Sequence, residues 1–249
     1  PLFNAGIGAT CTAEGTFELD ASIMEGKDLS AGAVAGLKHV KHPINAAYAV
    51  KTKSPHVMLS GAGAEEFAKE QGLEMVEDNM YFATPKTMEW IEKLKQESKK
   101  NGTVGCVVLD KQGNLTAGTS TGGMFKKRWG RIGDSPVIGA GTYADNNSCA
   151  VSCTGHGEYF IRHAVAFDVC ARYKYLKESV EKAADYIIHT ELNTNAGNGG
   201  LIAVDKLGNI AMPYNSGGMF RGFLYKEKGS PEIKKGCGIG KKIVVVGEK

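Results

Sequence analysis

The sequence predicts a layered fold of the α/β or α+β class, in which helices cover two stacked sheets. Two observations predict it. A strand–turn–strand motif occurs twice at a constant offset, and two strongly periodic helical stretches lie between the copies. The chain has 249 residues, 42% of them hydrophobic, which suffices for one large domain or two small ones with a substantial core.

The first half of the chain is expected to combine extended segments with short helices. Residues 1–30 are rich in glycine and indicate loops around a strand at 16–24. Alanine-rich stretches predict helices, and an apolar triplet predicts a short buried strand. The expected helices span residues 31–41, 44–53 and 61–71, and the expected strand spans residues 57–59.

A helix that begins at Thr84-Pro85 leads to an unusual joint. Threonine is a good N-cap and proline is favoured at the first helical position, so the helix is expected to continue through Leu94. Residues 96–102 are charged and end in Gly102. They indicate an accessible linker before the apolar strand that follows.

An internal repeat marks two equivalent hairpins. Asp110–Leu115 recurs as Asp205–Ile210, and Gly122–Phe125 recurs as Gly217–Phe220, in both cases 95 positions later. Each copy combines a strand, a tight turn, a second strand and a glycine bend. A favoured hairpin turn would explain the first match alone. The second match at the same offset favours two similar packed sheets, or one sheet with internal pseudo-symmetry.

The segment between the hairpins is expected to supply strands and then two helices. Apolar stretches with glycine predict the strands, and apolar residues on one helix face, such as Phe160, Ile161 and Ala164, predict the helices. One more strand is expected near the C-terminus. The expected strands span residues 136–141, 148–153 and 243–246, and the helices span 157–175 and 178–192.

Charge and composition exclude several functional classes. The net charge is +3 with both signs interspersed, so there is no electrostatic footprint for nucleic acid, and the basic run 126–128 is expected to be a solvated loop. No apolar run approaches the roughly 20 residues that a membrane-spanning helix needs. Six scattered cysteines fit reduced thiols in a cytoplasmic protein better than a disulfide scaffold.

The joint at Gly102-Thr103 carries the main chemical hypothesis. A threonine hydroxyl is a weak nucleophile that needs a nearby base. At a chain start its own α-amine, with an unperturbed pKa of about 7.7–8.0, can be that base. Glycine before the joint can adopt the angles that a strained peptide bond requires, and a β-branched strand would hold Thr103 rigidly. We therefore predict self-cleavage between Gly102 and Thr103, although an ordinary turn before a strand has the same pattern.

Three further polar stretches are candidates for the same site. Thr121 ends the hairpin that the nucleophile opens, so either it supports the nucleophile or it is a strand-end threonine. Arg131 and Asp134 share a glycine-bracketed loop, where they either bind a carboxylate and an ammonium group or pair with each other on the surface. Thr154 and Gly155 lie in a strand-to-helix turn, which is either an oxyanion site or an ordinary connection.

Together these stretches resemble the N-terminal-nucleophile hydrolases of the plant-type asparaginase and isoaspartyl peptidase family. The motifs occur in order over nearly the whole chain, which makes the set highly specific. They are residues 1–6 (PLFNAG), 19–24 (LDASIM), 32–35 (GAVA), 103–105 (TVG), 119–123 (TSTGG), 130–136 (GRIGDSP) and 153–158 (CTGHGE).

The resemblance implies both a fold and an activity. It implies a single α+β domain over residues 1–249, built as a four-layer αββα sandwich. Self-cleavage would give pieces 1–102 and 103–249, assembled as a dimer of α/β heterodimers. Thr103 would attack the side-chain amide of asparagine or the β-linked peptide bond of an isoaspartyl dipeptide. These small molecules are the expected partners, with no nucleic acid and no membrane.

The resemblance also implies roles for residues that act on the reacting bond. Carried over motif by motif, Thr121 supports the nucleophile, and Thr154 and Gly155 form the oxyanion hole. Asn4 lies near the nucleophile. No cofactor is implied for catalysis.

Other implied roles concern binding. Arg131 would grip the α-carboxylate of the substrate, while Asp134 and the Gly157 carbonyl would hold its α-amine. A structural sodium ion is expected on the backbone carbonyls of Phe3, Ala5 and Ile7.

The sequence departs from the family pattern at two places. The family has a strand and a His-Gly-Gly turn upstream of the position of Pro1, so we expect a fold without that N-terminal strand. The linker before Thr103 is also shorter than the family pattern predicts.

Two other hypotheses remain open. Glycosylasparaginase shares Thr103 and the segment 130–134, whereas residues 3–6 and 199–201 favour the isoaspartyl branch. The non-enzyme hypothesis is an unprocessed, inactive fold that only binds amino acids.

Overall fold

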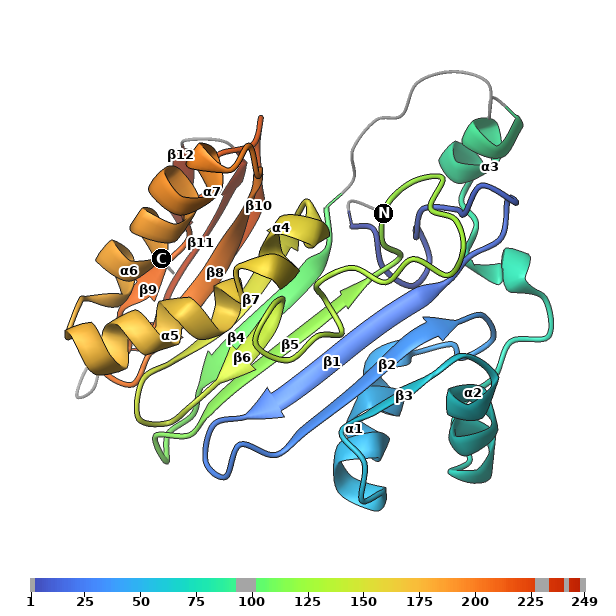
Figure 1. Ribbon diagram of the computed structural model, residues 1–249, viewed down its shortest axis with the longest axis horizontal. Helices are drawn as coiled ribbons and strands as arrows, with labels where there is room; N and C mark the ends of the chain where they lie inside the picture. Colours follow the sequence, from blue (N-terminus) through green and yellow to red (C-terminus); the bar gives the residue numbers. More distant parts are fainter. Residues whose placement is uncertain (1–2, 93–101, 227–232, 240–241, 247–249) are drawn as a thin grey trace.

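Within the part of the chain that the structure describes, α-helices are combined with three β-sheets, and the fold therefore belongs to the α+β class that the sequence predicts (Figure 1). The computed structural model describes residues 3–92, 102–226, 233–239 and 242–246. Most of the predicted linker before Thr103 lies outside the described residues, as do Pro1 and Leu2. No helix in the described part of the chain is long and apolar enough to cross a bilayer.

The largest sheet carries the predicted nucleophile at one end. Its strand order is β3-β2-β1-β5-β4, and all neighbours are antiparallel except β2 and β3. The strands are β1 (Leu19–Glu25), β2 (Ala31–Leu37), β3 (Met58–Ser60), β4 (Val104–Leu109) and β5 (Leu115–Thr121).

The predicted helix over residues 31–41 is wrong, because this stretch forms strand β2. Helix α1 (Pro43–Lys53) packs directly on β1 and β2, and a Cβ added at Gly32 would overlap the Ala47 carbonyl oxygen. Strand β2 therefore needs small residues so that helix α1 can approach it. The resulting alanine-rich sequence looks like that of a helix, which explains the wrong prediction. Strand β3 forms as predicted, but it is exposed at the sheet edge rather than buried.

The second sheet has the order β6-β7-β8-β9 and is antiparallel throughout. Its strands are β6 (Thr142–Ala144), β7 (Cys149–Gly155), β8 (Gly199–Asp205) and β9 (Ile210–Ala211). The predicted strand at 136–141 is wrong: the chain turns there, with Gly139 at φ +92°, and the strand begins only at Thr142.

A third sheet is formed by the C-terminal strands in the order β10-β11-β12. They are β10 (Phe220–Lys226), β11 (Ile233–Ile239) and β12 (Lys242–Val246). Strand β12 confirms the strand that was expected near the C-terminus.

The two larger sheets pack against each other, and helices cover their other faces (Figure 1). Strands β4 and β5 contact β7, while helices α1 and α2 (Gly61–Glu70) pack on the first sheet. Helices α5 (Val165–Leu176) and α6 (Val180–Tyr186) pack on the second. One buried cluster lies on each helix side, and a third one, which includes Leu115 and Ala150, lies between the sheets.

The long predicted helices form, but each is interrupted. Ala164, at φ +46°, separates α4 (Gly157–Arg162) from α5. Helix α6 continues through a π-helical turn (Ile187–Glu191) into α7 (Leu192–Thr194). In the first half, a 3-10 turn (Asn79–Phe82) precedes α3 (Pro85–Glu92), which begins where Thr84-Pro85 predicts.

The internal repeat corresponds to two equivalent hairpins in different sheets. Asp110 accepts hydrogen bonds from the backbone of Gln112 and Asn114 and from the Asn114 side chain. Asp205 makes the same three bonds to Leu207 and Asn209. The first hairpin joins β4 to β5 and the second joins β8 to β9, in two sheets that contact each other. Of the two arrangements that the repeat left open, the structure therefore has two packed sheets and not one pseudo-symmetric sheet.

Candidate active site

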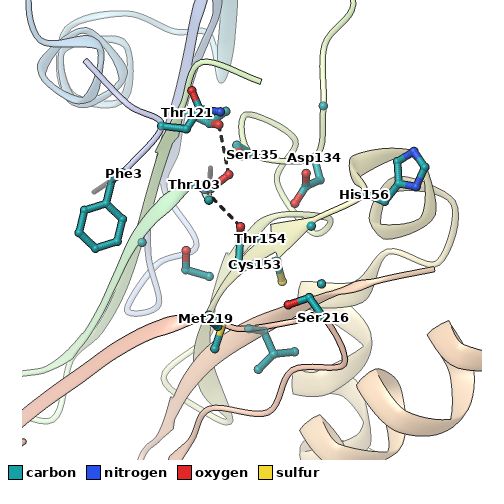
Figure 2. A pocket seen from close by; sticks show the side chains of 18 of the residues that line it. Phe3, Thr103, Thr121, Asp134, Ser135, Cys153, Thr154, His156, Ser216 and Met219 are labelled. Carbon is teal, nitrogen blue, oxygen red and sulfur yellow. Dashed lines mark hydrogen bonds between the residues drawn. The ribbon is translucent and has the colours of Figure 1, made fainter. Parts of the chain in front are cut away.

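The Gly102-Thr103 joint lies at the start of β4, in a pocket of about 780 Å³ (Figure 2). The Gly102 carbonyl accepts a hydrogen bond of 2.7 Å from the Asn4 backbone N–H. The peptide bond on which self-cleavage is predicted is therefore held by a segment about a hundred residues upstream.

Thr121 lies beside Thr103, as the tight hairpin predicted. The Thr103 hydroxyl donates a hydrogen bond of 3.1 Å to Thr121 Oγ1. The Gly123 backbone N–H donates to the same Thr121 oxygen at 3.0 Å. Thr121 is buried, so its hydroxyl is fixed by these contacts on two sides.

Thr154 approaches Thr103 from the second sheet. The Thr103 backbone N–H donates a hydrogen bond of 3.3 Å to Thr154 Oγ1, at the end of β7 (Figure 2). The next residue, Gly155, has φ +153°, and a Cβ there would overlap the backbone of Asn198 and Gly199. Thr103 therefore lies between two hydroxyls that belong to different sheets.

Asn4 ties together the loops around the nucleophile. Its side chain donates to the Gly123 carbonyl at 2.7 Å and accepts from the Thr10 N–H at 2.7 Å. Its backbone carbonyl accepts from the Gly122 N–H at 2.9 Å. Asn4 is 3% exposed, so these contacts replace water as its hydrogen-bond partners.

Arg131 pairs with Glu158 rather than with Asp134. Its Nε and Nη2 groups each donate to a Glu158 carboxylate oxygen at 2.8 Å. The Arg131 guanidinium holds the pKa of Glu158 below its usual value. The surface pair between Arg131 and Asp134, which the sequence left open, is absent from the described residues.

Asp134 is buried beside this ion pair. Burial raises the pKa of its carboxyl from 3.8 to about 7, although nearby Arg131 opposes the shift. Among the described residues, Asp134 Oδ2 has no hydrogen-bond partner. A buried, unpartnered carboxyl oxygen in a pocket wall is suited to receive an ammonium group from a ligand.

Gly157 gives Arg131 and Asp134 the space that they need. A Cβ at this position would lie 2.8 Å from both Arg131 Nη2 and Asp134 Oδ1. Gly157 is the first residue of α4, so the start of this helix lies against both charged side chains.

Two charged residues beside the site were missed or misjudged from the sequence: Lys127, which lies against Gly123 of the pocket wall, and Glu158, which pairs with Arg131. The basic run 126–128 was expected to be solvated, but the Lys127 side chain is 1% exposed. Its Nζ donates a hydrogen bond of 2.9 Å to the Glu18 backbone carbonyl and lies 3.8 Å and 3.9 Å from the Glu18 and Asp20 carboxylates. Burial lowers its pKa. From the sequence, Glu158 was named only as the last residue of the motif 153–158 and was given no role. Nothing in the local sequence signals either long-range ion pair.

The described geometry brings together a threonine at a strand start, two flanking hydroxyls, an arginine and a buried carboxyl. A family model described as Asparaginase matches residues 1–233. This chain belongs to the asparaginase family. The match includes every residue that the sequence singled out for the site.

Curated relatives in the family are similar over most of this chain. An isoaspartyl peptidase of Salmonella typhimurium is 50% identical over 239 residues, covering 90% of this chain and 76% of the relative. An isoaspartyl peptidase of Escherichia coli is 45% identical over 252 residues, covering 92% and 78%. An isoaspartyl peptidase/L-asparaginase of Mus musculus is 44% identical over 231 residues, covering 88% and 69%.

Proposed function

We propose that this asparaginase-family chain cuts itself between Gly102 and Thr103, and that the freed Thr103 hydrolyses asparagine and β-aspartyl dipeptides. The observation that carries the proposal is the position of Thr103. Its hydroxyl bonds to Thr121 and its nitrogen bonds to Thr154, inside a pocket that also contains Arg131 and Asp134. The names of the relatives support the same two activities.

Self-cleavage begins with attack of the Thr103 hydroxyl oxygen on the Gly102 carbonyl carbon. The Oγ1–C bond forms, the C–N bond breaks, and the hydroxyl proton passes to the Thr103 nitrogen, so that the amide becomes an ester with a free amine. The Asn4 N–H, 2.7 Å from the Gly102 oxygen, stabilises the negative charge that develops there. Water then hydrolyses the ester, which leaves a Gly102 carboxylate and a free Thr103 amine.

The mature reaction uses the same hydroxyl on a different carbonyl. The Thr103 amine takes the hydroxyl proton while Oγ1 attacks the side-chain carbonyl of the substrate. The Thr154 hydroxyl and the Gly155 N–H stabilise the oxyanion. Ammonia, or the amino group of the second residue of a dipeptide, then leaves with a proton. Water hydrolyses the aspartyl ester and releases aspartate.

The substrate is bound through its two charged groups, the α-carboxylate and the α-ammonium group. Arg131 binds the α-carboxylate through the N–H groups that Glu158 does not use. Asp134 and the Gly157 carbonyl bind the α-ammonium group, which offers the buried carboxyl a charged partner. The side-chain carbonyl is thereby directed to Thr103.

A sodium ion is proposed at the N-terminal loop. The carbonyls of Phe3, Ala5 and Ile7 accept none of the hydrogen bonds found between described residues, whereas the Gly6 carbonyl accepts one from Ala9. Carbonyl oxygens are suitable ligands for a hard cation. Such an ion would fix the loop that carries Asn4, and it would take no part in the reaction.

The remaining proposals concern the whole molecule. We propose that the mature domain is a four-layer αββα sandwich that assembles as a dimer of α/β heterodimers. The face-to-face packing of the two larger sheets under helices supports the layers. The six cysteines are free thiols, which supports a reducing compartment such as the cytoplasm.

Intact mass and activity test the main proposal together. Purified protein is expected to contain two pieces, and N-terminal sequencing of the second is expected to begin at Thr103. Thr103→Ala is expected to leave one uncut chain that releases no ammonia from asparagine. An uncut chain that hydrolyses asparagine at full rate would overturn the proposal. Cleavage with activity on glycosylated asparagine alone would favour glycosylasparaginase, and binding of amino acids without turnover would favour the non-enzyme hypothesis.

A further inference from the structure

Four buried hydroxyls lie between the two larger sheets, below the candidate active site. Thr119 Oγ1 lies 2.7 Å from Ser152 Oγ, and Ser22 Oγ lies 2.8 Å from Thr142 Oγ1. Thr142 Oγ1 also lies 2.5 Å from Thr119 Oγ1. All four side chains are at most 3% exposed. The four hydroxyls therefore form one chain of contacts, Ser22–Thr142–Thr119–Ser152, that joins the two larger sheets, with Thr119 and Ser152 at one end and Ser22 at the other.

The Thr119–Ser152 pair lies on the same two strands as the two hydroxyls that contact Thr103. Thr119 precedes Thr121 by two residues on β5, and Ser152 precedes Thr154 by two residues on β7. Side chains two residues apart on a strand lie on the same face. The Thr119–Ser152 pair therefore connects the two sheets two residues along the strands from Thr121 and Thr154, the residues that contact Thr103.

The strand that carries the nucleophile is shaped to admit this pair. Gly105 is two residues after Thr103 and is the register partner of Thr119. A Cβ at Gly105 would overlap the Ser152 hydroxyl. Only glycine allows the serine to reach across β4 and contact Thr119.

The second pair has the same chemistry but a different position. Ser22 is the register partner of Thr119, and Thr142 is the register partner of Ser152. Ser22 Oγ also lies 2.6 Å from the Ser135 carbonyl oxygen. This pair also joins the sheets, but it lies one strand further from β4.

We propose that Thr119 and Ser152 are positioning residues that fix the distance between Thr121 and Thr154, and hence the geometry around Thr103. A hydrogen bond between hydroxyls has a preferred length and direction, which apolar packing lacks. A small displacement of a reacting group costs far more in rate than in binding, because attack requires a narrow range of distances. The inference rests on the proposed role of Thr103.

The experiment compares the two pairs. Thr119→Val and Ser152→Ala are each expected to lower kcat on asparagine on the order of 10- to 100-fold. The KM should stay within about twofold, because Arg131 and Asp134 are untouched. Self-cleavage of freshly purified precursor should slow in parallel. The double variant should be no slower than Thr119→Val alone, because that substitution already removes the Thr119–Ser152 hydrogen bond together with the Thr119 contacts to Thr142 and to the Gly141 carbonyl.

Ser22→Ala is the matched control, since it removes an equally buried hydroxyl from the same interface. It is expected to lower the melting temperature about as much as Ser152→Ala while kcat stays within about twofold. Thr119→Ser, which keeps the hydroxyl, is expected to restore most of kcat. If Thr119→Val does not yield folded protein, Ser152→Ala gives the same readout, because it removes a single oxygen.

Two results would overturn the inference. One is an unchanged kcat in both Thr119→Val and Ser152→Ala. The other is an equal loss of kcat in Ser22→Ala, which would show that any loss of packing in this interface slows the enzyme. Either result leaves the proposed function intact if Thr103→Ala is uncut and inactive. Activity of Thr103→Ala would instead remove the proposed function itself.

Discussion

The Glu158 carboxylate holds the Arg131 guanidinium with two hydrogen bonds of 2.8 Å, from Nε and Nη2. A guanidinium group has five N–H donors, so three remain for a ligand. Glu158 therefore fixes the plane of the group without using up its binding capacity. The pair is partly exposed and contributes little to stability by itself, which points to orientation as its main effect.

Arg131→Ala is expected to raise the KM for asparagine by about 10- to 100-fold, because charge-assisted hydrogen bonds to the substrate α-carboxylate are lost. The kcat should change less, since the reacting groups are untouched. Arg162→Ala on the same short helix as Glu158 is the control, because Arg162 packs over Tyr159 and is not in the pocket wall. Steady-state kinetics that show an unchanged KM for Arg131→Ala would make Arg131 structural.

Asp134 is expected to make stability depend on pH. Its pKa is raised to about 7 when folded, so the folded protein binds the proton more tightly than the unfolded chain. This group therefore stabilises the folded state below about pH 4, and the contribution is lost as the pH rises through 7. Asp134→Asn keeps the shape without a charge. Its melting temperature relative to the wild type should increase between pH 5 and pH 8, and a constant difference would contradict the assignment.

The same titration should affect substrate binding in the opposite direction. Only the ionised carboxylate attracts the substrate α-ammonium group, so the wild-type KM should rise as the pH falls below about 7. Asp134→Asn should have a high KM at every pH. The inhibition constant of the product aspartate is measured over the same pH range. It reports binding alone, so it separates this effect from titration of the Thr103 amine, which changes turnover.

The sequence predicts local features of this fold better than tertiary contacts. The hairpin turn explains why Thr121 was placed beside Thr103, since both lie on one short hairpin. The helix expected at 31–41 failed because β2 needs small residues under α1, and nothing local distinguishes that need from helical propensity. The Arg131–Glu158 pair joins residues 27 positions apart through folded loops, so spacing cannot reveal it.

Gly157→Ala is expected to raise the KM for asparagine by about tenfold or more, with a smaller change in kcat. The added methyl group would lie 2.8 Å from Arg131 Nη2 and from Asp134 Oδ1, so both substrate-binding groups must move. Gly63→Ala on α2 is the matched control, because a Cβ there meets nothing within 4 Å. Equal kinetics for the two variants would show that the start of α4 has room to adjust.

Phe220→Ala is expected to discriminate between substrates. The rings of Phe3 and Phe220 pack edge to face at 6.0 Å, and both residues line the pocket. Phe3 and Asp134 lie on opposite sides of Thr103 in Figure 2, and Asp134 is proposed to hold the α-ammonium group, so Phe3 would face the leaving group of a bound substrate. The KM for β-aspartyl-phenylalanine should rise about three- to tenfold, while that for asparagine stays unchanged. Leu224→Ala on the same strand, 71% exposed, is the control. An equal rise in KM for both substrates would show that the aromatic pair does not contact the leaving group.

Asn4→Ala is expected to slow self-cleavage about tenfold or more. The Asn4 backbone N–H holds the Gly102 carbonyl, and the Asn4 side chain fixes the position of that backbone. Loss of the bonds to Gly123 and Thr10 frees that segment to move. Asn79→Ala is the matched control: its side chain makes comparable bonds to the backbone of Phe17, and neither residue lines the pocket. The measurement is the rate at which purified precursor converts to two bands on a denaturing gel. Both variants should lose stability, but only Asn4→Ala should lose cleavage. If Asn79→Ala slows cleavage equally, the effect reflects general destabilisation, and Asn4 has no specific part in holding the Gly102 carbonyl.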